Sequence, residues 1–195
     1  GTLFHEILEI LRIKKPTAYL LENVPNMENH DDGKTMLAIE QRLRDIGYSF
    51  WPEKLKASDF GLPTFRKRLF MVGFRYDPEN KKTFRFPKPN GSRTPTLSEF
   101  FGGRWSRDIA YTLRVGGVDS GFDDKRNWDS YKIDGKVRKI TVNEAKKLMG
   151  FPDNFEFPVS DGIAMKQLGN SGAIPVVKAV AREIIKTINR YYPNG

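Results

Sequence analysis

The order of hydrophobic patterns along residues 1–75 is the feature that most constrains the fold. Residues 3–11, LFHEILEIL, carry apolar side chains at helical spacing, and residues 18–24, AYLLENV, are a short apolar run typical of a buried strand. A second helical pattern over residues 36–46 ends at Gly47, and two strand-like runs, YSFWPEKLKA and RLFMVGFR, flank the turn FGLP. Helix, strand, helix, strand, strand is the order of an α/β fold.

This order predicts a parallel sheet with one helical crossover. Asp31 or Asp32 stands where the N-cap of the second helix is expected. No opening strand precedes the first helix, so we interpret the sheet as the second half of a larger one. Its first sheet edge would then be exposed, which favours association with another polypeptide.

The remainder of the chain changes character twice. From residue 80 to about residue 139 it is rich in proline, glycine and polar side chains, which predicts a smaller, loop-rich lobe with short strands. The run TVNEAKKLMG then predicts a short helix with Thr141 as cap and Glu144 completing a capping box, and residues 173–191 predict a long amphipathic helix. We divide the chain into residues 1–84, 85–137 and 138–195.

The composition excludes several classes of protein. The 195 residues contain no cysteine, so disulfides, thiolate metal sites and cysteine nucleophiles are absent from them. His5 and His30 are the only histidines, and we expect no metal centre. No apolar run approaches the roughly 20 residues of a membrane span, so we predict a soluble, cytoplasmic protein.

The positive charge is concentrated in one region. The formal net charge is +9, and residues 61–93 carry nine Lys and Arg against two acids, whereas residues 1–60 carry eight against ten. Such a regional excess suggests a polyanion partner, and a solvated basic loop is the alternative.

Glu22 and Asn23 are the first candidates for chemistry. They follow Leu20 and Leu21 at the carboxyl end of a strand, where ligands bind in open α/β sheets. Desolvation there raises the pKa of a carboxyl group, so it can share a proton near neutral pH. The alternative is an acid that only caps a loop.

Two further segments carry polar groups in suggestive places. Arg66 and Arg68 lie two apart at the start of a strand, so both can point to one face, where they would meet phosphate, a base edge or Glu22; two exposed arginines are the alternative. Asn170 and Ser171 lead into the last helix, whose free amides would attract an anion, and ordinary capping is the alternative.

Five segments in this order resemble the DNA (cytosine-5)-methyltransferase family: GTLFHEI, LLENV, FGLPTFRKRLFMVGFR, KITVNEAKKLMGFPDNF and LGNSGAIPVVKAVA. The resemblance runs from residue 1 to about residue 185. It implies the second half of a Rossmann-like S-adenosylmethionine-dependent sheet, plus a small loop-rich target-recognition lobe. The implied activity is methyl transfer to C5 of a flipped cytosine in duplex DNA, in a bacterial restriction-modification system.

The resemblance also implies residue roles. Glu22 would activate the base, with Asn23 beside it, and Arg66 and Arg68 would hold the cytosine and orient the acid. Asn170 and Ser171 would line the S-adenosylmethionine pocket. In the recognition lobe, Trp128 and Tyr131 are expected to pack or stack. The lobe candidates for contacts with bases or phosphates are the cations Arg104, Arg107, Arg114, Lys125 and Arg126.

Three departures from the family pattern stand out. Thr64 replaces a usual glutamine, and Asn143 stands where an arginine is common. The cofactor loop and the Pro-Cys nucleophile would precede residue 1, so we expect the chain alone to be inactive, and to bind duplex DNA weakly and with strong salt dependence.

Two origins would explain that absence: a truncated enzyme, or one subunit of a split enzyme whose partner supplies the missing half. A catalytically inactive DNA-binding module or a purely structural subunit is the alternative function. Because an acid at a cytosine pocket has no use in a module that only binds DNA, Glu22 and the paired arginines favour an enzyme.

Overall fold

The computed structural model describes residues 2–75, 84–89, 91, 93–115 and 121–191. Its contacts divide the chain into two compact units. The first unit comprises residues 1–55, 68–87 and 179–195, and the second comprises residues 56–67 and 88–178. No described helix is long and apolar enough to cross a membrane.

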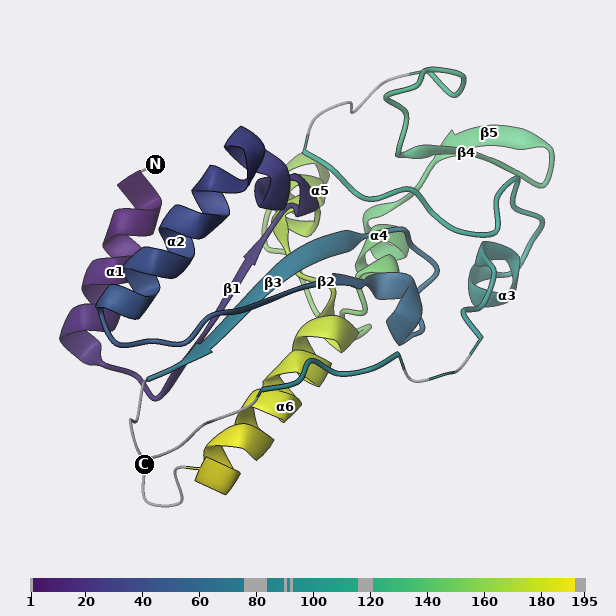
Figure 1. Cartoon of the computed structure of the whole chain (residues 1–195). Coiled ribbons are helices and arrows are strands. Elements are labelled where there is room, and N and C mark those ends of the chain that lie inside the picture. The colour runs from purple at the N-terminus through teal and green to yellow at the C-terminus, as the bar shows by residue number, and fades with distance from the viewer. Residues whose placement is uncertain (1, 76–83, 90, 92, 116–120, 192–195) are drawn as a thin grey trace. The chain divides into compact units, whose positions relative to one another are not determined.

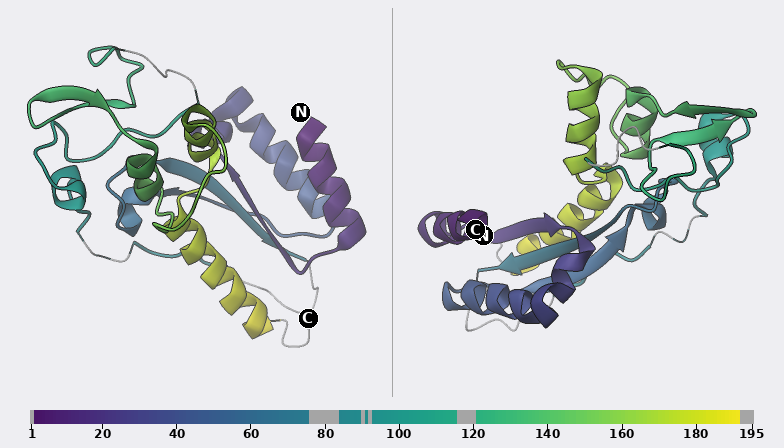
Figure 2. Two further views of the ribbon diagram at one scale, coloured as in Figure 1. Left: turned by 180° about the vertical axis from the view of Figure 1, so that it is seen from behind. Right: turned by 90° about the horizontal axis from the view of Figure 1, so that it is seen from above.

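The first unit is a three-stranded sheet with helices on both faces. Its strands β1 (Ala18–Asn23), β2 (Trp51–Lys56) and β3 (Lys67–Phe74) are ordered β1-β3-β2. The helices α1 (Thr2–Lys14) and α2 (Lys34–Asp45) lie side by side on one face (Figures 1 and 2). The 3-10 segment η1 (Pro25–Gly33) joins β1 to α2.

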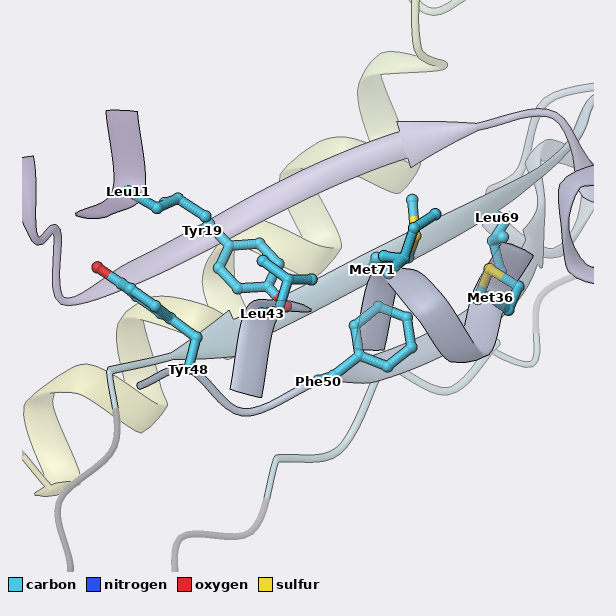
Figure 3. Close-up of a cluster of buried hydrophobic side chains, with 9 residues drawn as sticks. Leu11, Tyr19, Met36, Leu43, Tyr48, Phe50, Leu69 and Met71 are labelled. Carbon is cyan, nitrogen blue, oxygen red and sulfur yellow. The ribbon is translucent and has the colours of Figure 1, made fainter. Parts of the chain in front are cut away.

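The hydrophobic core of this unit lies between the sheet and these two helices. Nine buried side chains form it, and Figure 3 shows them on the side of the strands away from α6 (Ile174–Tyr191). Gly73 is required here, because a Cβ at this position would lie 2.1 Å from the Ser49 carbonyl oxygen and 2.2 Å from the Tyr19 ring. The Tyr19 hydroxyl donates to that same carbonyl at 2.9 Å. The core members are Leu11, Tyr19, Met36, Ile39, Leu43, Tyr48, Phe50, Leu69 and Met71.

The structure corrects two expectations about the first unit, one about its sheet and one about the start of α2. β1 pairs antiparallel with β3, with Glu22 opposite Phe70, so the sheet is not uniformly parallel. The short connection through η2 (Ala57–Phe60) and Gly61 turns the chain back, and β3 enters between β1 and β2. Neither predicted aspartate caps α2: Gly33 is the N-cap, and Asp31 and Asp32 adopt left-handed backbone angles before it.

The second unit contains the loop-rich region and three complete helices. These are α3 (Leu97–Phe101), α4 (Val142–Leu148) and α5 (Asp161–Asn170), and the first residues of α6 also belong to it. The strands β4 (Ser130–Ile133) and β5 (Lys136–Lys139) pair as an antiparallel hairpin. The predicted capping box of Thr141 and Glu144 is confirmed at the start of α4. Helix α5 was not predicted from the sequence.

Candidate functional site

Glu22 and Arg68 form an ion pair at one end of the sheet. Arg68 Nε lies 3.0 Å from Glu22 Oε1. Because Glu22 is opposite Phe70, Arg68 is its diagonal neighbour on the same face of the antiparallel pair. The side chain of Glu22 is 30% exposed and that of Arg68 is 13% exposed, so a ligand can reach the carboxylate while its partner is mostly covered. Burial lowers the pKa of the Arg68 guanidinium, and the adjacent Glu22 carboxylate partly offsets this effect.

The chain after Glu22 is fixed by local contacts. Asn23 Oδ1 accepts a hydrogen bond from the Val24 amide at 2.8 Å, which orients the turn into η1. One turn further on, Glu28 forms an ion pair with Lys54 of β2. The sequence does not predict the Glu28–Lys54 pair, because this pair depends on how η1 and β2, which are distant along the chain, are placed.

Arg66 takes different partners from Arg68. Its side chain is only 2% exposed. The guanidinium donates to the carbonyl oxygens of Leu113 at 3.1 Å and Gly169 at 2.9 Å, and to that of Ser171. All three acceptors belong to the second unit, as does Arg66, whereas Arg68 belongs to the first. The three carbonyl contacts of Arg66 thus lie within the second unit, and the ion pair of Arg68 lies within the first.

Thr64 is also buried in the second unit. Its hydroxyl donates to the Tyr111 carbonyl oxygen at 3.2 Å, and its backbone bridges to Ala110. The threonine thus ties this segment to residues 110 and 111, in the middle of the predicted recognition lobe.

Asn170 and Ser171 end a helix instead of starting one. Asn170 is the last residue of α5, and Ser171 Oγ donates to the Leu168 carbonyl oxygen at 3.0 Å. The expectation that the next helix offers free amides is wrong, because the Ile174 amide donates to the Met149 carbonyl oxygen at 2.9 Å. Of the two polar groups, the exposed Asn170 side chain is the more accessible to a ligand.

Three of the five cations predicted to contact DNA are engaged within the protein. Arg107 donates to the Tyr111 hydroxyl at 2.9 Å and lies 4.1 Å from the centre of that ring. Arg114 donates to the Arg126 carbonyl oxygen at 2.7 Å. Arg126 makes a two-pronged pair with Asp124, which holds the pKa of that carboxyl at about 2.

The other two cations lie at the surface, whereas the two aromatic residues are buried. Arg104 and Lys125 are exposed. Trp128 and Tyr131 are 1% and 0% exposed, so they pack within the lobe and present no ring to a base. Among the described residues, no group of three or more His, Asp or Glu side chains could hold a metal ion.

Three comparisons relate the chain to known proteins. A family model described as C-5 cytosine-specific DNA methylase matches residues 1–119 and 109–186. The type II methyltransferase M.NlaX of Neisseria lactamica is 36% identical over 94% of this chain and 67% of its own length. M.MspI of a Moraxella species is 34% identical over 99% of this chain and 52% of its own length.

Solved structures share the fold at lower identity. A putative DNA modification methyltransferase encoded within an Escherichia coli prophage aligns with a TM-score of 0.74 and 19% identity, over 96% of this chain and 74% of its own. The Schizosaccharomyces pombe Dnmt2 methyltransferase aligns with a TM-score of 0.70 and 19% identity, over 95% of this chain and 72% of its own. These alignments place the chain in a methyltransferase fold.

Proposed function

Because the chain belongs to the C-5 cytosine-specific DNA methylase family, we propose that it is part of an enzyme that methylates C5 of cytosine in duplex DNA. The chain spans about half to two thirds of the length of the relatives described above. Their type II names favour a role in a bacterial restriction-modification system. The Glu22–Arg68 ion pair is the observation that carries the proposal.

Glu22 is proposed to act on the ring of a cytosine turned out of the duplex. A carboxyl group that shares a proton with N3 draws electron density from the ring, which makes C6 electrophilic. Arg68 fixes the orientation of the carboxylate through the 3.0 Å contact. Asn23 is then a neighbouring donor or acceptor for the cytosine edge, at the end of the same strand.

Arg66 is proposed to act through the protein backbone. Its guanidinium holds three carbonyl groups of the second unit, so we assign it a positioning role without contact to the cytosine. This differs from the direct cytosine contact that the family resemblance implies.

The nucleophile must come from outside these residues. Methyl transfer to C5 requires a thiolate to add to C6, and the 195 residues contain no cysteine. We propose that another segment or a partner chain supplies it. Leu3, Ile10 and Ile13 of α1 are 74%, 59% and 63% exposed, and β1 is the first strand in the sheet order. An apolar helix stripe beside a sheet edge suits such a partner.

S-adenosylmethionine is the methyl donor that the family implies, and this chain offers a small part of its pocket. The exposed amide of Asn170 can bind a polar edge of the cofactor, and Ser171 lies next to it with its hydroxyl oxygen still able to accept. The bound cofactor would supply the methyl group. We therefore propose that these two residues line the pocket and that the nucleophile-bearing part completes it.

Complementation tests the proposed function. The chain is mixed with a fragment that carries the cofactor loop and the Pro-Cys segment of a family member, and incorporation of labelled methyl groups into duplex DNA is measured. We expect activity only in the mixture, and a loss of about 100-fold or more with Glu22→Gln, as is typical for a general acid. Glu53→Gln, an exposed acid of β2, is the matched control and should retain full activity.

Undiminished activity of Glu22→Gln would refute the role of this acid. If the chain binds duplex DNA but every mixture is inactive, the result would favour a DNA-binding module without catalysis.

A further inference from the structure

The β4–β5 hairpin carries a concentration of positive charge that the candidates above do not explain. Four of its residues are cations, and every residue of β5 is exposed. Figure 1 shows the two strands as a ribbon joined by a tight turn. The cations are Lys132, Lys136, Arg138 and Lys139.

The hairpin is held rigidly from beneath. Its inner side chains Tyr131 and Ile133 are buried, and the Tyr131 ring lies 5.5 Å from the ring of Trp105, centre to centre. The Lys132 carbonyl oxygen accepts from the Ser106 amide at 2.9 Å, and Trp105 bridges to Ile133. These contacts fix the backbone from which the outer side chains project.

The acid at the tip, Asp134, is exposed, and its carboxylate is held by the adjacent backbone. Asp134 and Gly135 both have left-handed backbone angles, as a two-residue hairpin turn requires. Asp134 Oδ1 accepts from the Arg104 amide at 2.8 Å, and the Asp134 amide donates to the Arg104 carbonyl oxygen at 2.9 Å. A Cβ at Gly103 would lie 2.9 Å from Asp134 Oδ2, so one side of this carboxylate lies against the Gly103 backbone.

The cations divide into two groups. The Arg138 guanidinium donates to both carboxylate oxygens of Glu144, at 2.7 and 2.9 Å. Lys139 Nζ lies 3.7 Å from Asp129 Oδ2. Lys132 and Lys136 are exposed and have no ion-pair partner among the described residues, and the same holds for Arg104 beside the tip. The tip thus presents three cations that have no ion-pair partner among the described residues, beside the exposed carboxylate of Asp134.

We propose that the tip of the β4–β5 hairpin, with Arg104 beside it, is a contact surface for the phosphate backbone of duplex DNA. A two-stranded ribbon fits the major groove, and cations that lack acid partners can neutralise phosphates without first breaking an ion pair. This inference rests on the proposed function, because that function requires the chain to bind duplex DNA. It moves the expected interface from Arg107, Arg114 and Arg126, which have protein partners, to Arg104, Lys132 and Lys136.

The experiment compares binding of the full 195-residue chain to a labelled duplex of random sequence by fluorescence anisotropy, between about 50 and 200 mM salt. The double variant Lys132→Gln with Lys136→Gln removes two phosphate contacts. We expect it to reduce the slope of log affinity against log salt by about 1.8 and to weaken binding about 30-fold at 0.15 M salt. Lys132→Arg with Lys136→Arg should restore both quantities.

The control is Lys14→Gln with Lys34→Gln, which removes two exposed lysines from the first unit and should leave the slope and the affinity almost unchanged. Equal slopes for the unaltered chain and the hairpin variant would overturn the inference while leaving the proposed function standing. Hairpin variants that only self-associate more would show that the lysines protect a strand edge, and would also overturn it. An unaltered chain without salt-dependent binding to DNA would contradict both.

Discussion

Replacing Arg66 with methionine tests how the second unit is held together. The buried guanidinium donates to three carbonyl groups that lie 47, 103 and 105 residues away along the chain. Two of these carbonyls, those of Gly169 and Ser171, lie at the end of α5, where a helix has no further amides to offer. Methionine has a similar length but no donor, so the substitution would leave these acceptors unsatisfied.

The expected loss can be bounded from these contacts. A hydrogen bond from a charged donor contributes about 1.5–3 kcal/mol, but three bonds from one group are not additive. Each buried carbonyl group that is left unsatisfied costs about 1–3 kcal/mol, and the three costs are less than additive. We therefore expect Arg66→Met to lower the free energy of unfolding by about 3–5 kcal/mol. Arg66→Lys should recover only part of this, because an ammonium group lacks the planar fork that reaches several acceptors.

Urea denaturation followed by tryptophan fluorescence measures this loss, since Trp105 and Trp128 are buried in the second unit. Arg126→Met is the matched control, because that side chain is 76% exposed and pairs with a neighbouring acid on its own loop; we expect no measurable change in stability. A loss below about 1 kcal/mol for Arg66→Met would refute the reasoning. An accompanying fall in the salt slope of DNA binding would show instead that Arg66 contacts phosphate.

Three further substitutions test separate contacts. Burial alone would raise the pKa of Glu144, but hydrogen bonds from Arg138 and Thr141 outweigh this effect and lower that pKa below 4.5. Its stabilisation is therefore present above about pH 4.5 and lost on acidification; Glu144→Gln should cost about 1 kcal/mol at pH 7 and flatten stability measured from pH 6 to 3. Lys146→Met removes the donor to two loop carbonyls and should cost about 2–3 kcal/mol by urea denaturation. Gly73→Ala forces a 2.1 Å contact, so its thermal unfolding midpoint should fall by several degrees.

Local patterns predicted the helices and strands well where the hydrophobic period was strong. The first helix, the strand that carries Glu22 near its carboxyl end, the capping box of Thr141 and Glu144, and the last helix are all confirmed. The family resemblance is also confirmed by the family model and by relatives that match nearly the whole chain. These features depend on residues close together in the sequence, or on motifs in a fixed order.

Features that depend on tertiary placement were not predicted. The insertion of β3 between β1 and β2 follows from a turn whose direction the strand pattern does not encode. Helix α5 has a weak apolar period and two glycines, and Gly169 is small because a Cβ there would lie 3.0 Å from the Arg114 backbone. The partners of Arg66 are distant along the chain, so its spacing from Arg68 could not separate their environments.

The identity of the methylated product tests the central claim most directly. Duplex DNA from the complementation mixture is digested to nucleosides, and these are separated and identified by mass spectrometry. We predict 5-methyl-2′-deoxycytidine in the mixture with the unaltered chain, and its loss with Glu22→Gln but not with Glu53→Gln. A methyl group on an exocyclic amine, or the same yield of 5-methyl-2′-deoxycytidine without Glu22, would contradict it.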